Sequence, residues 1–301
     1  MPRRKSAILR FMREQPLGTF GLAIITVYVV CAILAPWLAP YDPVANDLEA
    51  QTRPPSGQHW FGTDQYGRDI LSRIMHGART ALAVGLISSI VGCSVGALIG
   101  AASGYLGGRF DLVIQRLVDV LMSFPIIVLA VVVGAVFPKE IAIPGFWIIP
   151  SIDLSTIAGV SVSLIAAIAL PMVPRMARVA RSSTLSLVQM PFIDAARTAG
   201  FGSTRIVLRH IAPNIAAPYL IMVTAFIAQA ILSEASLSFL GLGVTEPTPA
   251  WGLMLSGEAA NFYEQAPWMI YFPGLAITLS VFAFNLFGDS LRDWLDPKLK
   301  V

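Results

Sequence analysis

Six long stretches without Asp, Glu, Lys or Arg constrain this 301-residue chain more than any other feature. They cover residues 15–41, 80–108, 120–138, 154–174, 210–233 and 265–288. A helix of about 20 apolar residues crosses the roughly 30 Å hydrocarbon core of a bilayer, and each stretch is long enough to do so. With 55% apolar and only 13% charged residues, the composition is that of an integral membrane protein. The sequence therefore predicts an all-α chain with six transmembrane helices.

The positions of the positive charges predict how these helices are oriented. Cytoplasmic loops close to membrane spans carry an excess of Lys and Arg. With a cytoplasmic N-terminus, 16 of the 21 Lys and Arg residues fall on the cytoplasmic side. The other five are Arg53, Arg68, Arg73, Arg79 and Lys139. We therefore expect both termini in the cytoplasm of a cell bounded by a plasma membrane or an inner membrane.

These spans divide the chain into five segments. Residues 1–17 form a cytoplasmic tail, 18–39 the first transmembrane helix, 40–79 an extracytoplasmic loop, 80–290 the membrane core and 291–301 a second cytoplasmic tail. Residues 68–79 alternate apolar and polar side chains at helical spacing, which predicts an amphipathic helix at the external interface. Two shorter apolar pieces, 141–152 and 235–245, contain Pro or Gly and are expected to be interfacial or to extend a neighbouring helix.

A basic, glycine-containing segment interrupts the apolar pattern at residues 194–214, "DAARTAGFGSTRIVLRHIAPN", within the cytoplasmic loop 180–213. Pro191 suits the first turn of a short helix and Gly200 suits its end. Three alanines present a small-residue face on that helix, and Ser203 is expected to cap a second helix. The segment has three interpretations. It could be a loop anchored by positive charge, a helix-turn-helix for DNA, or a docking element for a cytoplasmic protein. Tethering to the membrane at both ends disfavours DNA.

This segment resembles the signature of permease subunits of ATP-binding cassette importers, which reads Glu-Ala-Ala, then Gly, then Ile-x-Leu-Pro. The matching residues are Asp194, Ala195, Ala196, Gly200, Ile211 and Pro213. Asp replaces Glu, and Ala212 stands where the family has Leu. Three further stretches resemble the C-type permease of dipeptide, oligopeptide and nickel importers. They are "HWFGTDQYGRDILSRIMHGAR" (59–79), "SEASLSFLGLGVTEPTPAWGLML" (233–255) and "FNLFGDSLRDWLDPKLK" (284–300).

The resemblance implies a type I importer permease fold and a heteromeric complex in a bacterial plasma or inner membrane. The expected partners are a second permease, two ATPase subunits, an extracytoplasmic substrate-binding protein and membrane lipid. ATP and Mg²⁺ would be bound by the ATPase subunits, with no cofactor in this chain and no nucleic acid. The short helix after Pro191 would dock in an ATPase subunit. The external residues of the family signature are Gly62, Thr63, Asp64, Gly67, Arg68 and Asp69. Di- or oligopeptides are the expected substrates, with nickel, glutathione or another small ligand as the alternative.

The chain carries no recognisable catalytic motif. It has no G-x-x-x-x-G-K-[ST] phosphate loop and no H-E-x-x-H, so ATP binding is not indicated. One G-x-S-x-G match, at 92–96, lies within the apolar stretch 80–108 rather than at the strand-to-helix turn of a nucleophile elbow, so hydrolase activity is not indicated either. No metal site is expected. Arg116 and Asp119 are three apart and are expected to form a structural ion pair or act in gating, and Glu234 a buried hydrogen bond or a contact on the substrate path. An ion-coupled secondary transporter is the alternative outside the family, although no inverted repeat is visible.

Overall fold

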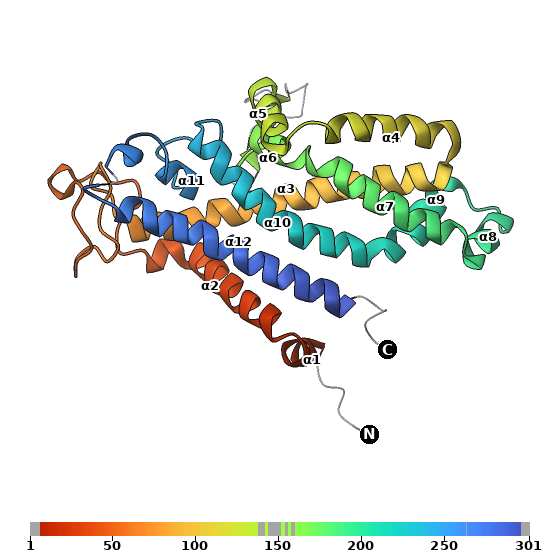
Figure 1. Cartoon of the computed structure of the whole chain (residues 1–301), viewed down its shortest axis with the longest axis horizontal. Coiled ribbons are helices and arrows are strands. Elements are labelled where there is room, and N and C mark those ends of the chain that lie inside the picture. Colours follow the sequence, from red (N-terminus) through yellow and green to blue (C-terminus); the bar gives the residue numbers. More distant parts are fainter. Residues whose placement is uncertain are drawn as a thin grey trace.

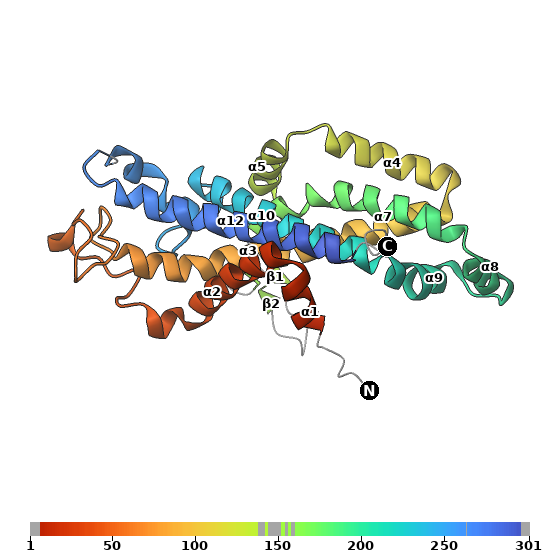
Figure 2. The ribbon, with the colours of Figure 1, turned by 60° about the horizontal axis from the view of Figure 1, so that its bottom comes forward.

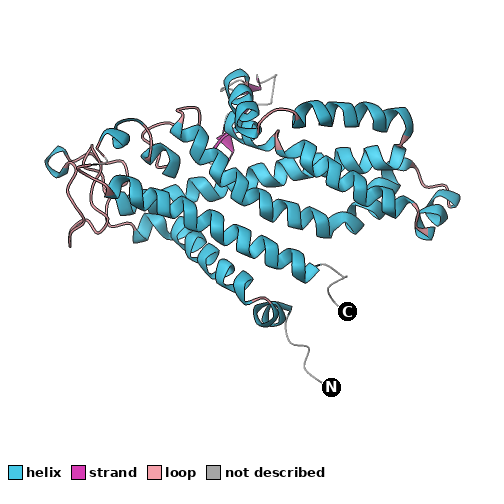
Figure 3. Cartoon of the chain, viewed as in Figure 1, coloured by secondary structure: helices cyan, strands magenta, loops and turns pink. Residues whose placement is uncertain are grey.

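The computed structural model describes residues 7–137, 142–143, 152–153, 156–157, 160–262 and 264–295. Over these residues the chain is an elongated bundle of helices (Figures 1 and 3), with two-residue strands only between α5 and α6. Four helical runs are long and apolar enough to cross a membrane. They are α2 (Pro16–Leu38), α3 (Ile70–Leu106), the run Ser203–Phe239 that ends in α10 (Ala216–Phe239), and α12 (Trp268–Leu295). The prediction of an all-α membrane chain is confirmed.

The other two expected spans are bent rather than continuous. α4 (Gly108–Met122) meets α5 (Ile126–Val136) at 97°. A single helix over 120–138 is therefore wrong, because Pro125 disfavours helix at the preceding residue and lacks the N–H that would continue it. α6 (Val162–Ala169) meets α7 (Met172–Val188) at 47° beside Pro171. The described residues thus contain four candidate spans, or up to six if each bent pair crosses once.

The short strands lie where the sequence suggested membrane or interfacial helix. β1 (Ala142–Ile143) pairs with β2 (Ile152–Asp153), and β3 (Thr156–Ile157) pairs with β4 (Val160–Ser161), both antiparallel. The expected span 154–174 is therefore wrong at its start, because helix begins only at Val162. Most of the piece 141–152 lies outside the described residues. In the piece 235–245, α10 continues to Phe239, so its first part extends a helix as expected.

Close packing of α3 against α7 forms the centre of the bundle. Along α3, a glycine recurs every fourth residue at Gly92, Gly96, Gly100 and Gly104. A Cβ at Gly96 would lie 2.5 Å from the carbonyl oxygen of Val173, and one at Gly100 would lie 2.8 Å from the carbonyl carbon of Ala177. Small residues at this spacing allow membrane helices to approach until their backbones touch. The stripe therefore fixes the position of α7 on α3.

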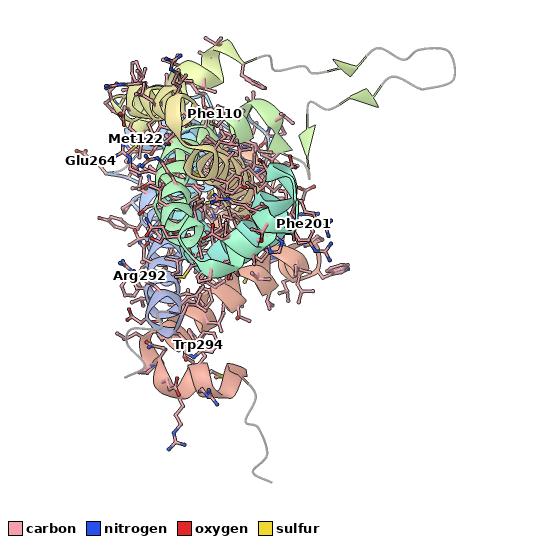
Figure 4. All side chains as sticks on the ribbon, turned by 90° about the vertical axis from the view of Figure 1, so that its right-hand side faces the viewer. Phe110, Met122, Phe201, Glu264, Arg292 and Trp294 are labelled. Carbon is pink, nitrogen blue, oxygen red and sulfur yellow. The ribbon has the colours of Figure 1, made fainter. Side chains whose placement is uncertain are left out.

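α2 and α12 form the outer layer of the same bundle. The hydroxyl of Tyr28 on α2 donates to the carbonyl of Ala276 on α12 at 3.0 Å. A Cβ at Gly21 would lie 2.7 Å from the carbonyl oxygen of Ala283, so these two helices also meet through backbone. The amphipathic helix α1 (Ala7–Glu14) packs Phe11 edge-on against Trp294 at the end of α12. Viewed from the α8 end, Trp294 lies on the opposite side of the bundle from Phe110 and Met122 of α4 (Figure 4).

The two ends of the bundle differ in character. One end carries α8 (Pro191–Thr198), α9 (Ser203–Ile206), the π-helical turn η2 (Val207–Ile211) and the 3-10 turn η3 (Ala212–Ile215). The other carries the ordered loop 39–69 with η1 (Leu48–Ala50), together with α11 (Trp251–Met254) and η4 (Gly257–Asn261). We call these the α8 end and the loop end. α1 and the C-terminal end of α12 both lie in the half of the bundle nearer the α8 end (Figure 1).

α4 lies alongside α7 (Figures 1 and 2), and two ion pairs connect the two helices. Arg181 Nη2 lies 2.5 Å from Asp111 Oδ2, and the hydroxyl of Ser103 donates to the same carboxylate. Arg178 Nη2 donates to Asp119 Oδ1 at 2.7 Å. The expected pairing of Arg116 with Asp119 is therefore wrong, because α7 brings Arg178 to Asp119 from a part of the chain that local spacing cannot reveal. Arg116 itself is exposed.

Candidate functional site

α8 has the boundaries that its sequence predicts. Pro191 occupies the first turn, where its missing N–H removes no helical hydrogen bond. At the other end Gly200 has φ +78°, Gly200 N–H donates to the carbonyl of Arg197, and Phe201 N–H donates to that of Ala196. This pair of hydrogen bonds is the Schellman motif, for which a residue with positive φ is required and Gly is preferred. The result is a two-turn helix with a fixed start and a fixed end.

The faces of α8 differ from the expectation for one of its alanines. Ile193 is fully buried and Ala196 is 5% exposed, so both point into the bundle. Asp194, Ala195 and Ala199 are exposed. The small-residue face offered for docking therefore includes Ala195 and Ala199, whereas Ala196 packs internally. The correction follows from tertiary packing, because a stretch of alanines shows no face of its own in the sequence.

An arginine links α8 to the end of α3. The Arg197 guanidinium lies 5.3 Å from the ring centroid of Tyr105, and Nη1 donates to Asp194 Oδ1 at 3.3 Å. The neighbouring Tyr105 has the largest influence on the pKa of Arg197 and raises it, and Asp194 raises it further. A guanidinium over an aromatic face contributes about 0.5–1 kcal/mol at an exposed site. α8 is thus attached to the bundle both by its buried face and through Arg197.

The second half of the segment returns the chain to the bundle. Gly202 caps α9 by its backbone position and Ser203 is the first helical residue, so the expected side-chain cap by Ser203 is wrong. Ile211 is fully buried, and exposed Pro213 is the second residue of the 3-10 turn η3 that leads into α10. Arg205 lies 4.1 Å above the Phe201 ring. Ile211 therefore packs within the bundle, whereas Pro213 is open to contact from outside.

The external family residues build an ion-pair cluster at the loop end. Asp64 accepts hydrogen bonds from the backbone of Tyr66 and Arg68 and from Arg68 Nε at 2.7 Å. Arg68 Nη1 donates to Glu246 Oε2, also at 2.7 Å. Arg73 is 1% exposed, and its Nη2 lies 3.5 Å from Glu246 Oε1. We call Asp64, Arg68, Arg73 and Glu246 the external cluster.

The external cluster joins three segments that are far apart in the sequence. Asp64 and Arg68 belong to the loop 39–69, Arg73 to α3 and Glu246 to the connection between α10 and α11. Burial lowers the pKa of Arg68, but hydrogen bonds and charge from Glu246 and Asp64 outweigh this effect and raise it above its ordinary value. Arg68 therefore remains charged, and the cluster stays an ionic connection.

The other signature residues shape the backbone around this cluster. Gly62 and Gly67 have φ +76° and +75°, and a Cβ at Gly67 would lie 2.6 Å from the carbonyl carbon of Asp47. The buried hydroxyl of Thr63 donates to the carbonyl of Ala50. Asp69 caps α3 by accepting from the backbone N–H of Ser72 at 2.8 Å. The signature is thus a folding motif for the loop end.

The same geometry corrects the expectation for residues 68–79. α3 runs without interruption from Ile70 to Leu106, so no separate interfacial helix precedes the span. The first part of the polar face is not turned to water either, because Asp69, Ser72 and Arg73 are buried beneath the loop 39–69 and Glu246, whereas Arg79 at its end is exposed. Amphipathic spacing predicted the helix correctly, but it cannot distinguish a solvated polar face from one paired within the protein.

Glu234 lies inside the bundle near the end of α10. Its side chain is fully buried, and its Oε1 accepts a hydrogen bond from Ser238 Oγ at 2.7 Å. Ser238 Oγ in turn accepts from the backbone N–H of Val244 at 3.1 Å. Glu234 therefore makes a buried hydrogen bond and, through Ser238, holds the turn that follows α10.

Comparison with known proteins assigns the family. Residues 96–301 match the model of the binding-protein-dependent transport system inner membrane component, and residues 5–55 match that of the N-terminal transmembrane domain of oligopeptide transport permease C. The first match covers more than half of the chain. The chain belongs to this permease family. It is a permease subunit of an ATP-binding cassette importer and a multi-pass membrane protein, and members of the family are normally non-catalytic.

Individual relatives of the permease match over nearly its whole length. It is 43% identical over 292 residues to the glutathione transport system permease protein GsiD of Escherichia coli, covering 97% of this chain and 89% of the relative. It is 39% identical over 289 residues to the dipeptide transport system permease protein DppC of Alkalihalophilus pseudofirmus, covering 96% and 88%. An inward-facing structure of the MetNI methionine ABC transporter matches with TM-score 0.51 and 16% identity, over 75% of this chain and 98% of that one. That likeness concerns the fold alone.

The sequence analysis did not predict two features of the permease, the glycine stripe of α3 and the contact between Arg73 and Glu246. The glycine stripe of α3 is visible as "GCSVGALIGAASG" at 92–104, and its four-residue repeat was the available signal. Arg73 and Glu246 were not expected to interact, because they are 173 residues apart. Only the fold brings the connection after α10 onto the start of α3.

Proposed function

We propose that α8 is the coupling element by which a partner ATPase subunit moves the permease helices. Asp194, Ala195 and Ala199 provide an exposed face at the tip of the bundle, and Ile193 and Ala196 fix the opposite face within it. A short helix anchored on one side and small on the other can fit a cleft in a second protein. ATP and Mg²⁺ would be bound by two such ATPase subunits, since this chain has no phosphate loop.

The proposed topology has six spans, with both termini in the cytoplasm on the same side of the membrane as α8. Each bent pair, α4–α5 and α6–α7, would then cross the membrane once. The location of α1 and the end of α12 toward the α8 end supports this arrangement, as does the excess of Lys and Arg assigned to that side. The loop end would face outward, toward an extracytoplasmic binding protein. A second permease would supply the other half of the pathway.

The proposed substrates are di- or oligopeptides, including glutathione-like peptides. The names of the relatives support this class, because dipeptide and glutathione permeases share 39% and 43% identity with the chain. Selection between peptides is expected to depend mainly on the binding protein. The single observation that carries the coupling proposal is the exposed face of α8 between Pro191 and the Schellman turn at Gly200.

The test of coupling is to enlarge that face without disturbing the bundle. Ala195→Trp places a large ring on the exposed side, so the purified complex should lose the ATPase subunits and ATP-driven uptake while the permease remains folded. Ala45→Trp, an exposed alanine in the loop 39–69, is the matched control and should retain both ATPase subunits. Ala196→Trp is unsuitable because Ala196 is buried. Normal assembly and uptake by Ala195→Trp would exclude α8 as the docking element.

A further inference from the structure

We propose that a pocket near the loop end of the bundle binds the backbone of the transported peptide. It is a cavity of about 260 Å³ between α3, α5, the start of α6 and the connection between α10 and α11. This inference rests on the proposed peptide substrate and adds a site within the permease itself. We call it the hydroxyl pocket, after Thr80, Ser161, Ser163, Thr245 and Thr248, which line it.

The hydroxyl pocket has no ionisable side chain among its lining residues. Small-molecule sites are mostly about 300–1,000 Å³, so this cavity is close to the lower end of that range and suits two or three small residues. A second cavity, of about 410 Å³ between α10 and α12, has an almost wholly apolar wall and offers one hydroxyl, that of Ser236. Unlike this apolar cavity, the hydroxyl pocket combines space with several neutral donors and acceptors.

Two of its hydroxyls are free to bind a ligand. Thr80 Oγ1 already donates to the carbonyl of Pro249, and Ser161 and Ser163 bond to each other at 2.7 Å. Within the described part of the chain, no side-chain hydrogen bond is assigned to Thr245 or Thr248. Both lie on the connection after α10, at the wall of the cavity. A hydroxyl both donates and accepts, so each of these two can bond either group of a peptide unit.

The end of α10 holds the connection that carries these two threonines. Glu234 accepts from Ser238, and Ser238 accepts from the N–H of Val244, which lines the pocket. A Cβ at Gly243 would lie 2.7 Å from the backbone nitrogen of Ser238, so the turn packs tightly on the end of α10. The buried Glu234–Ser238 pair thus positions the turn that carries Thr245 and Thr248, although neither Glu234 nor Ser238 lines the pocket itself.

The chemistry of the wall selects a polypeptide backbone. Every peptide unit that does not involve a proline nitrogen presents one neutral N–H donor and one neutral C=O acceptor, whatever the neighbouring side chains. Neutral hydroxyls can hydrogen-bond to these groups without contacting the peptide side chains. Such recognition does not depend on the sequence of the peptide, which suits a pathway shared by different peptides. A bare divalent metal ion such as nickel would instead need imidazole, thiolate or carboxylate ligands, and none lines this pocket.

The test uses the assembled importer in proteoliposomes with its own binding protein. The measured quantity is the ratio of uptake of trialanine to uptake of trialanine methylated on one backbone nitrogen, which lacks that donor. Because the binding protein is the same throughout, a change in the ratio between permease variants reports on the permease. The variant Thr245→Val/Thr248→Val removes both hydroxyls and keeps the side-chain shapes. We expect its ratio to fall about 2- to 12-fold, because the valines remove the hydroxyl that accepts from the backbone N–H of trialanine, a hydrogen bond that the methylated peptide cannot make.

Two further variants separate the proposal from misfolding. Thr245→Ser/Thr248→Ser keeps the hydroxyls and should retain the wild-type ratio. Thr278→Val, on α12, removes a hydroxyl that bonds only its own helix at Gly274 and should also leave the ratio unchanged. Wild-type peptide uptake with an unchanged ratio in the assembled Val variant would overturn the hydroxyl pocket alone. Absence of peptide uptake by the wild-type importer would overturn the proposed substrate as well.

Discussion

Replacing Gly100 by alanine tests whether the glycine stripe holds α3 against α7. The new Cβ would lie 2.8 Å from the carbonyl carbon of Ala177 and 2.9 Å from its Cα, and it would be closer still to the carbonyl oxygen. Ordinary van der Waals contact begins at 3.4 Å, so the helices must move apart by at least 3.4 − 2.8 = 0.6 Å at this point. Backbone atoms cannot rotate away as a side chain can, so the whole interface must yield.

The magnitude follows from this separation. A gap of about 0.5–1 Å loses a quarter to a half of the dispersion energy of the atoms that it separates. Overpacking of a well-packed interior costs about 1–3 kcal/mol, and the greater helix propensity of alanine returns about 0.5–1 kcal/mol. We therefore expect Gly100→Ala to lower the free energy of unfolding by about 0–2.5 kcal/mol relative to the wild type, and by about 1–3 kcal/mol relative to a helical Gly→Ala variant without overpacking.

Thermal denaturation of the purified permease in mild detergent measures this effect. Gly274→Ala is the matched control, because Gly274 is also within a helix and a Cβ added there would have nothing within 4 Å. It should be as stable as the wild type or more stable. If Gly100→Ala were as stable as Gly274→Ala, direct backbone contact between α3 and α7 would be refuted.

The remaining predictions concern the two ends of the bundle. Glu246→Gln leaves buried Arg68 and Arg73 with one carboxylate, that of Asp64. It should lower the free energy of unfolding by about 1–3 kcal/mol, nearer the lower value because Glu246 is half-exposed. A wild-type melting temperature would contradict an ionic connection there. Gly67→Ala requires a non-glycine residue at φ +75° and a shift of Asp47, and should destabilise by about 1–2 kcal/mol or more, whereas Gly57→Ala, in open space, should not. Asp111→Asn weakens a partly buried ion pair with Arg181 and should lower the free energy of unfolding by about 1 kcal/mol. Asp119→Asn affects a pair whose two side chains are about half-exposed, and should change the free energy of unfolding by less than about 0.5 kcal/mol. Equal losses would mean that burial does not determine how much each pair contributes.

Local sequence information predicted the fold class and the short elements well, for identifiable reasons. The boundaries of α8 were predictable because Pro191 and Gly200 act through their own backbone restrictions. Long apolar stretches revealed the four main spans because hydropathy is summed over many residues. Ala196 and the pair Asp119–Arg178 were not predictable, because their environment depends on which face of one helix meets another.

The bends and the external cluster show a second limit. Hydropathy measures whether a segment can lie in lipid, and it is unaffected by a turn at Pro125 or Pro171, so the bent pairs look like single spans. The polar face after Arg68 likewise has the spacing of a water-exposed helix. Its burial depends on Glu246, which approaches only after α10 has crossed the bundle.

The unbroken length of α3 has a mechanical consequence. Its 37 residues extend from the cap at Asp69, beside the external cluster, to Leu106, next to the Tyr105 ring that contacts Arg197 of α8. At 1.5 Å per residue the helix is about 55 Å long, so a rigid tilt of about 5° about one end would displace the other by roughly 5 Å. α3 can therefore act as a rigid lever, because α7 packs closely alongside it and resists bending. A small rotation of α3 at one face of the membrane would displace its other end by several ångströms at the opposite face.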